Sequence, residues 1–199
     1  SIDAGTTARA GYDEFDLNDA SETLTVDGIS YTFPLGDKTT VMIGDTVDGS
    51  SLFSIACVYG TPSNTMDDCG AVDSAFVGQG TTLAASYDFD NGFYTSFGYA
   101  GAGDSTNGLM TKEGLDSYGF NAAYTGDNYG LSLSYALVEA TTTSDDTSTA
   151  LNAYWTPDGF PSISVGYEWG DDGSAASTAD GLTSYFVGVQ FEEVGPGTL

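Results

Sequence analysis

Apolar and polar residues alternate with a period of two in several segments of the chain. In Tyr129–Leu137 the odd positions carry Tyr and Leu, and the even positions carry Gly, Ser and Ala. Ser162–Trp169 and Thr183–Phe191 follow the same pattern. Such alternation predicts β-strands with one apolar face and one small, polar face. Helical periodicity is nearly absent, so we expect an all-β protein.

About nine segments are strand-like, and several approach the nine to eleven residues that a tilted strand needs to cross a bilayer. In the first, the apolar positions shift from even to odd, and we expect a bulge at Gly28 to absorb the shift. The expected strands are Thr23–Phe33, Thr39–Gly44, Thr82–Tyr87, Phe93–Ala100, Asp116–Tyr124, Tyr129–Leu137, Thr149–Trp155, Ser162–Trp169 and Thr183–Phe191.

The links between these segments alternate between short and long. The short ones are rich in Gly, Asn, Asp and Pro, as tight turns are. They are Pro34–Lys38, Asp88–Gly92, Thr125–Asn128 and Thr156–Pro161, and the long polar ones are Asp45–Thr81, Gly101–Leu115, Val138–Ser148 and Gly170–Leu182. Outer-membrane barrels have short periplasmic turns and long extracellular loops. The links therefore predict an antiparallel up-and-down transmembrane β-barrel, of which about nine strands are visible.

Aromatic residues gather beside every short turn. The flanking rings are Tyr31, Phe33, Tyr87, Phe89, Phe93, Tyr94, Tyr124, Tyr129, Trp155 and Phe160, and Tyr99, Tyr118, Trp169 and Tyr185 lie near the other strand ends. Rings at both ends of the strands are typical of the aromatic girdles at membrane interfaces. Aromatic residues also fill the cores of other β proteins. The alternative is thus a soluble, secreted, acidic β-sandwich that acts as an adhesin or surface-coat module.

The composition excludes several functions. The chain has 29 acidic residues, three basic residues (Arg9, Lys38 and Lys112) and no histidine, with a formal net charge of −26. Nucleic-acid binding depends on Lys and Arg, so we expect none. Ser–His or Cys–His catalysis is impossible without histidine. The seven glutamates lie mostly in loops or near the chain ends, which disfavours a glycosidase pair, and we expect no enzyme activity.

Two cysteines and the absence of a long apolar run bear on the compartment. Cys57 and Cys69 suit a single disulfide, which favours a site outside the cytoplasm. No segment could form a membrane-spanning helix. The sequence shows no signal peptide and does not begin with Met. We therefore expect a processed or partial chain that forms one domain over residues 1–199.

Candidate functional residues lie on the polar strand faces and in the longest link. The link over residues 45–81 is expected to fold inward as a constriction that favours cations, because rings of Asp or Glu do so. The candidates for this constriction are Asp45, Asp48, Asp67, Asp68 and Asp73, with Cys57 and Cys69 stiffening the loop. The candidates for the lumen face are Asn121, Ser132, Ser134, Asn152, Ser164, Glu168 and Gln190. Solvated loop charges that serve no pore remain the alternative.

No cofactor is expected. The acidic pairs Asp67–Asp68, Asp145–Asp146 and Asp171–Asp172 offer oxygen ligands of the kind that Ca²⁺ prefers, but none has the spacing of a calcium loop with a closing Glu. Calcium therefore stays a weak alternative. Zinc and iron are not expected, since the chain lacks histidine and has one pair of cysteines.

Two motifs carry a resemblance to a known family. The stretch TLTVDGISYTFPLGDKTTVMIG at Thr23–Gly44 resembles a hairpin of the cyanobacterial outer-membrane porins, which are OprB-like and often labelled iron-uptake porins. SYFVGVQFEEV at Ser184–Val194 resembles a strand near their C-terminus. The resemblance implies passive diffusion of small hydrophilic solutes and inorganic ions, with cations or iron favoured, through a homotrimer in the outer membrane. It covers the barrel portion alone. Nine strands is an odd number, whereas bacterial barrels made of one chain have an even number. The chain also ends at Leu199, where a periplasmic turn would be due. We therefore expect a fragment.

Overall fold

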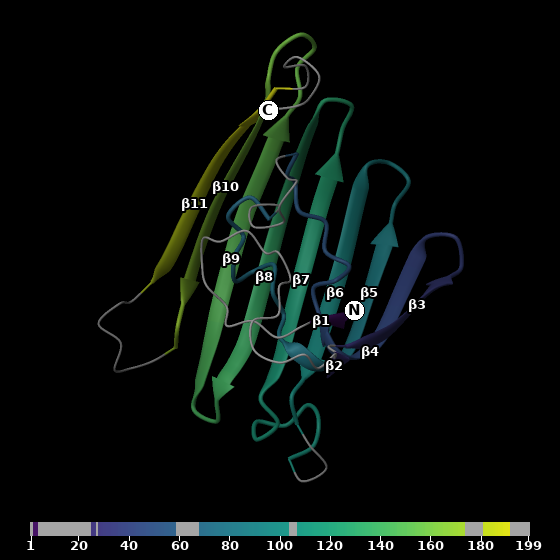
Figure 1. Ribbon diagram of the computed structural model, residues 1–199, viewed down its shortest axis with the longest axis vertical. Coiled ribbons are helices and arrows are strands. Elements are labelled where there is room, and N and C mark those ends of the chain that lie inside the picture. Colours follow the sequence, from purple (N-terminus) through teal and green to yellow (C-terminus); the bar gives the residue numbers. More distant parts are fainter. Residues whose placement is uncertain are drawn as a thin grey trace.

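Nine strands form one antiparallel sheet in which each strand pairs with its neighbours in the sequence (Figure 1). This computed structural model describes residues 2–3, 25–26, 28–58, 68–103, 107–173 and 181–191. The strands of the sheet are β3 (Ile29–Leu35), β4 (Thr39–Asp48), β5 (Gln79–Asp88), β6 (Phe93–Gly101), β7 (Asp116–Thr125), β8 (Tyr129–Thr141), β9 (Ser144–Trp155), β10 (Ser162–Asp171) and β11 (Leu182–Gln190). The predicted all-β, up-and-down architecture is confirmed.

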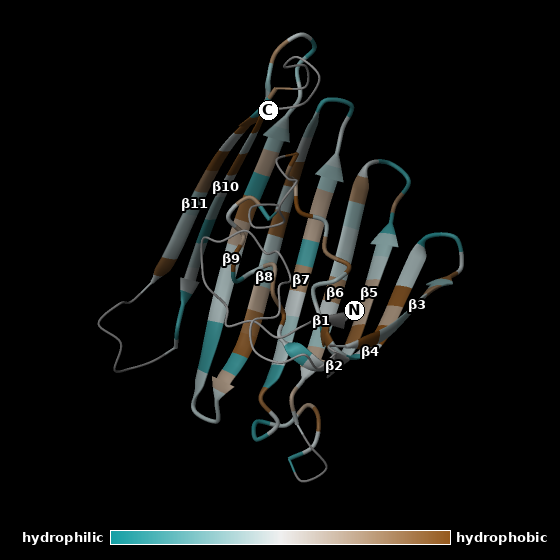
Figure 2. Ribbon diagram, viewed as in Figure 1, coloured by the Kyte–Doolittle hydropathy of each residue, from teal (hydrophilic) through white to brown (hydrophobic). Residues whose placement is uncertain are grey.

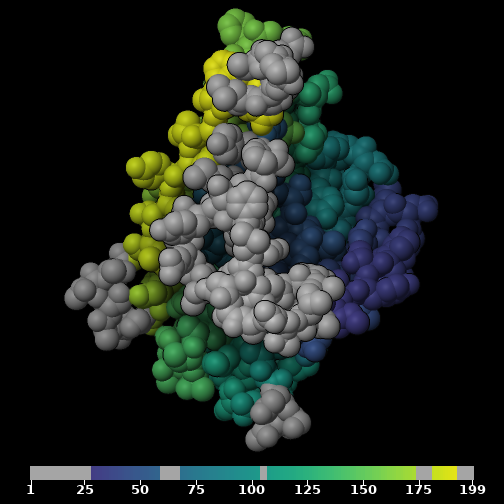
Figure 3. Space-filling view, in the orientation of Figure 1, coloured from purple at the N-terminus to yellow at the C-terminus, as the bar shows by residue number. Residues whose placement is uncertain are grey.

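The sheet is not closed into a barrel. Its outer strands are β3 and β11, which lie at opposite margins of the molecule, purple and yellow in Figure 3. Pro34 lies in β3. Proline has no N–H to donate, and it is tolerated in an edge strand because such a strand pairs with a neighbour on one side only. The described ranges contain no helix long and apolar enough to cross a membrane.

The first predicted strand is wrong. β2 (Thr25–Val26) pairs with β1 (Ile2–Asp3) in a separate two-stranded sheet, and the large sheet begins only at Ile29. The shift of apolar positions around Gly28 therefore marks the change from one sheet to the other and does not mark a bulge. An added Cβ at Gly28 would overlap the carbonyl oxygen of Thr46, so a side chain does not fit at this change of direction.

The four predicted tight turns lie at one rim, the upper end in Figure 1. They span residues 36–38, 89–92, 126–128 and 156–161. The opposite rim carries the links over residues 49–78, 102–115 and 172–181. Tight turns and long links are therefore sorted to opposite ends of the sheet, with one exception.

The exception is the predicted long loop Val138–Ser148, which is wrong. β8 and β9 continue through most of it and leave only residues 142–143 as a turn. Ser117 of β7 pairs with Val138, and Asp171 of β10 pairs with Thr147, so the hairpin over residues 139–146 projects beyond its neighbours. Its many Thr residues are β-branched and favour strand pairing even where both faces are polar.

Aromatic rings contact one another along the tight-turn rim. Phe93 lies 4.8 Å from Tyr124 between ring centroids, and Tyr124 lies 5.6 Å from Tyr129. Tyr129 pairs in register with Trp155 on β9. The rings predicted to flank separate turns thus form a row that crosses four strands, β6 to β9.

The two faces of the sheet have the opposite arrangement to that of a soluble sheet. Apolar side chains on one face are exposed, such as Leu131 at 53% and Val165 at 42%, whereas Ser132 and Ser164 on the other face are buried. Apolar and polar colours alternate along the strands in Figure 2. A soluble sheet buries its apolar face against a core. Here the link between β4 and β5 covers the polar face, and the described residues place no second layer on the apolar face.

Candidate pore loop and the polar face of the sheet

Residues 49–58 and 68–78, the described segments between β4 and β5, lie on the polar face of the sheet. Each segment contacts several strands through hydrogen bonds, and we call residues 49–58 the first limb and residues 68–78 the second limb. The wall of the sheet supplies side chains, and the limbs supply backbone atoms. We call the two limbs together the pore loop, after the inward constriction loop that the sequence predicts.

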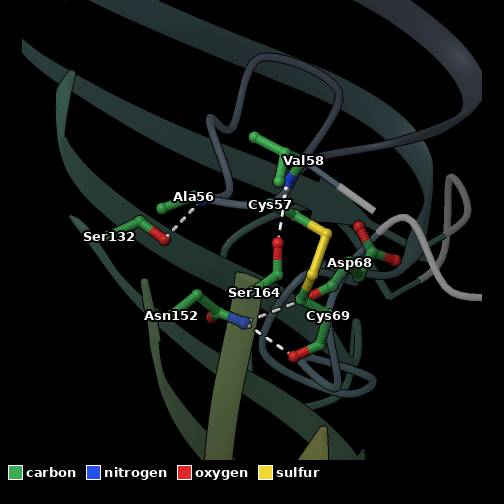
Figure 4. Close-up of a disulfide and its surroundings, with 8 residues drawn as sticks. All are labelled: Ala56, Cys57, Val58, Asp68, Cys69, Ser132, Asn152 and Ser164. Carbon is green, nitrogen blue, oxygen red and sulfur yellow. Dashed lines mark hydrogen bonds between the residues drawn. A yellow bond between two sulfur atoms is a disulfide. The ribbon is translucent and has the colours of Figure 1, made fainter. Parts of the chain in front are cut away.

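The first limb is held by β7, β8 and β10. Asn121 accepts a hydrogen bond from the Ser54 N–H at 2.9 Å and donates from Nδ2 to the Ser54 carbonyl at 3.1 Å. The Ser132 hydroxyl accepts from the Ala56 N–H at 2.8 Å, and the Ser164 hydroxyl accepts from the Val58 N–H at 3.0 Å (Figure 4). Buried backbone groups need such partners, because leaving one unsatisfied is costly.

The second limb is held by β9, β10 and β11. Asn152 donates from Nδ2 to the Cys69 carbonyl at 2.8 Å and to the Asp68 carbonyl at 3.2 Å (Figure 4). The Glu168 carboxylate accepts from two successive N–H groups of the loop, and the Ser184 hydroxyl donates to the Gly70 carbonyl. The second limb therefore lies against the strands nearest the β11 edge.

The predicted disulfide between Cys57 and Cys69 is formed and joins the two limbs (Figure 4). Its cysteines are adjacent to the loop atoms that Ser164 and Asn152 bind. A cross-link of this length stabilises the folded state mainly by limiting the unfolded chain, by about 3 kcal/mol. Together with the hydrogen bonds it fixes the loop in one position on the wall.

Small residues on the wall allow the loop to approach closely. At Gly98 an added Cβ would overlap the carbonyl oxygen of Gly49, and at Gly166 it would overlap that of Cys69. The small Gly, Ser and Ala residues that alternate with large apolar residues thus allow the backbone of the loop to lie directly on the sheet.

The predicted lumen residues lie on the predicted face, but the expectation that they meet water is wrong for most of them. Asn121, Ser132, Ser134, Asn152, Ser164 and Glu168 are buried, and Gln190 at the end of β11 is half-buried. The first six lie beneath the pore loop or beside the groups that bind it, as Ser134 accepts from Asn121 Nδ2 at 3.1 Å.

The four predicted constriction acids that the structure describes have different surroundings. Asp45 lies on β4 on the same face as Ile43, the apolar face, and so cannot line a lumen. Asp48 accepts from the Ser50 and Val77 N–H groups, each at 2.9 Å, and so joins the two ends of the pore loop. Asp68 and Asp73 are exposed on the loop, and Asp67 is outside the described residues.

Asp73 instead belongs to a group of acids that gathers at the long-loop rim. Burial raises the pKa of Asp146 on the projecting hairpin, and so do the charges of Asp172 at the end of β10 and of Asp73 on the pore loop. Lys112 contacts Glu139 and Asp145 nearby. We call Asp73, Asp145, Asp146, Asp171 and Asp172 the acidic mouth. Within the described ranges no group of three or more His, Cys, Asp or Glu side chains is arranged to hold a metal ion.

Two anchoring residues escaped the sequence analysis. Tyr94 on β6 donates its hydroxyl to the Leu52 carbonyl at 2.8 Å, and Ser184 on β11 binds Gly70. Both lie on the polar face, so the same alternation that identified the other wall residues could have found them.

Comparison of the sequence with known protein families gives no match, and comparison with curated proteins finds no similar one.

Proposed function

We propose that the chain forms part of the wall of an outer-membrane pore through which small hydrophilic solutes and inorganic ions diffuse, as the resemblance to the cyanobacterial porins implies. The observation that carries the proposal is the arrangement of the two faces. Large apolar side chains cover the exposed face, whereas the other face carries buried Ser, Asn and Glu side chains that bind the pore loop. Hydrocarbon outside and water inside would favour this arrangement, whereas water on both sides would oppose it.

A pore in lipid also requires that both free edges be paired, because unpaired backbone groups are not tolerated in hydrocarbon. The edges at β3 and β11 therefore need further strands, either from elsewhere in the same protein or from another copy. The apolar face carries smaller and less hydrophobic side chains along β9, where Thr149 and Ala153 lie on either side of Leu151. We propose that this strip contacts a neighbouring subunit of a homotrimer.

The acidic mouth makes the pore favour cations. Its five carboxylates come from three elements that meet at one rim, and Lys112 is the basic residue described near them. Local fields of one sign raise the concentration of the opposite ion and select for it. The preference thus originates at the mouth, to which Asp73 is the one loop acid predicted from the sequence that contributes.

Planar-bilayer recording tests the proposal. The purified protein should give ohmic conductance steps, and its reversal potential in a KCl gradient should favour K⁺. The quadruple variant D145N/D146N/D171N/D172N should conduct with a weaker preference for K⁺. Folded protein that inserts and gives no conductance would refute the pore, and an unchanged preference in the quadruple variant would refute the role of the mouth alone.

The soluble β-sandwich makes the opposite prediction for solubility. A protein of that kind stays monomeric without detergent, because a second layer covers its apolar face. The exposed apolar face described here should instead cause aggregation unless detergent is present. Analytical ultracentrifugation with and without detergent distinguishes the two.

A further inference from the structure

Two carboxylates of the wall hold the pore loop, Asp48 at the end of β4 and Glu168 on β10, whereas Ser, Asn and Tyr side chains hold it elsewhere. Glu168 is the more deeply buried of the two carboxylates. Glu168 is 3% exposed, and its Oε1 accepts from the Asp73 N–H at 2.9 Å and from the Ser74 N–H at 3.0 Å. Its protonation state therefore affects how firmly the second limb is held.

The second oxygen of this carboxyl group has no partner. Oε2 is buried without a hydrogen bond, and so is the hydroxyl of Ser74, whose N–H binds Oε1. An ionised carboxylate that is removed from water and left with an unpaired oxygen is strongly disfavoured. A neutral carboxylic acid can carry its proton on Oε2 and still accept both N–H groups at Oε1.

No described charge balances an ionised Glu168. On the neighbouring strands it pairs in register with Ala150 of β9 and Ser184 of β11, and its nearest neighbours on the same face of β10 are Gly166 and Gly170. The loop brings the carboxylate of Asp73, which adds a like charge. The described lysines pair elsewhere, Lys38 with Asp90 and Lys112 with Glu139 and Asp145.

We propose that Glu168 is a positioning residue that holds the pore loop on the wall in its protonated form, so that loss of the proton to the lumen water loosens the second limb and widens the pore. This inference rests on the proposed function. Acidification returns the proton from water to Oε2 and favours the docked loop. The pore is therefore narrower in acid.

Hydrogen exchange measures directly how firmly Glu168 holds the second limb. Protection factors of the Asp73 and Ser74 amides should fall by up to about tenfold per pH unit as Glu168 loses its proton, because one proton is linked to docking. In E168Q the neutral amide mimics the protonated acid, and the factors should stay high at every pH. The control D158N removes an exposed carboxylate from the turn at the opposite rim and should keep the wild-type profile.

Conductance gives the functional readout. Wild-type conductance should rise with pH, whereas E168Q should stay at the narrow level throughout. Two results would overturn the role proposed for Glu168: a wild-type dependence of conductance on pH in E168Q, or amide protection that rises with pH in the wild-type protein. If no variant conducts, the pore proposal fails, and the exchange measurements still decide whether Glu168 controls the loop. Should E168Q not fold, the sign of the wild-type exchange profile decides.

Discussion

Two arginine substitutions on the apolar face distinguish lipid from water as its surroundings. Leu133 is 38% exposed and Ile163 is 37% exposed, so both are aliphatic side chains with the same access to solvent. Leu133 shares a cross-strand row with Leu151 and Tyr167. Ile163 belongs to the row of Trp155 and Tyr129 at the tight-turn rim. The two side chains therefore differ mainly in their distance from the tight-turn rim, which corresponds to depth in a membrane.

The depth follows from the register. The two rows are four residues apart along each strand, which is about 13 Å at ~3.3 Å per residue. At a tilt of ~45° this is about 9 Å along the membrane normal. Arginine at the midplane of a barrel costs about 2–4 kcal/mol and near an interface about 0–1 kcal/mol. We expect L133R to lower the free energy of unfolding by about 2–4 kcal/mol, and I163R by less than about 1 kcal/mol.

Urea titration in lipid vesicles measures both values, with the fluorescence of Trp155 and Trp169 as the signal. On a water-exposed face, surface substitutions change stability by about 0.5 kcal/mol or less wherever they lie. Equal and small effects of L133R and I163R would therefore refute the membrane environment. Equal and large effects would indicate a protein layer over the whole face.

Three further predictions concern the pore loop. N121A removes both bonds to Ser54 and should cost about 3 kcal/mol, against about 1 kcal/mol for S132A, which loses one bond; equal losses in urea titrations would contradict the anchoring role of Asn121. Reduction of the disulfide, or the C57S/C69S pair, should cost about 3 kcal/mol and leave the strand signal in circular dichroism intact; loss of that signal would show that the loop holds the sheet. G166A should displace the loop at Cys69, cost about 1–3 kcal/mol and lower the exchange protection of the Val58 amide; unchanged protection would contradict the close approach.

The strands and their faces could be predicted because the alternation is local. In β8 every odd residue from Tyr129 to Tyr135 is exposed and every even residue is buried, as the sequence pattern requires. The position of the turns followed from Gly, Asn, Asp and Pro for the same reason. These features depend on residues that lie close together in the sequence, so a single sequence is enough to predict them.

The projecting hairpin was mispredicted because its composition is ambiguous. Thr, Ser and Asp dominate Val138–Ser148, and these residues are typical of loops, yet Thr also favours strands. Asp45 was assigned to a loop because the apolar alternation ends at Ile43, although β4 continues to Asp48 past an irregular pairing. Strands that continue with polar residues on both faces give no periodic signal.

The contacts of the pore loop could be predicted only in part. The sequence indicated a long inward loop and a disulfide, but it did not indicate that the lumen candidates would be buried under that loop. Their partners are backbone atoms such as the Ala56 N–H and the Cys69 carbonyl, which every residue type provides. Long-range contacts of this kind carry no signature in composition or spacing.

Because the wall recognises main-chain atoms of the loop, the side chains at those loop positions contribute little to attachment. Ser54, Ala56 and Val58 are held through their peptide groups. The partly exposed side chains of Ser54 and Val58 could thus be exchanged while the segment keeps its path, provided that the buried Ala56, the glycines and the cysteine pair remain. An engineer could use this chain as a fixed frame and vary the chemistry of the loop surface one residue at a time.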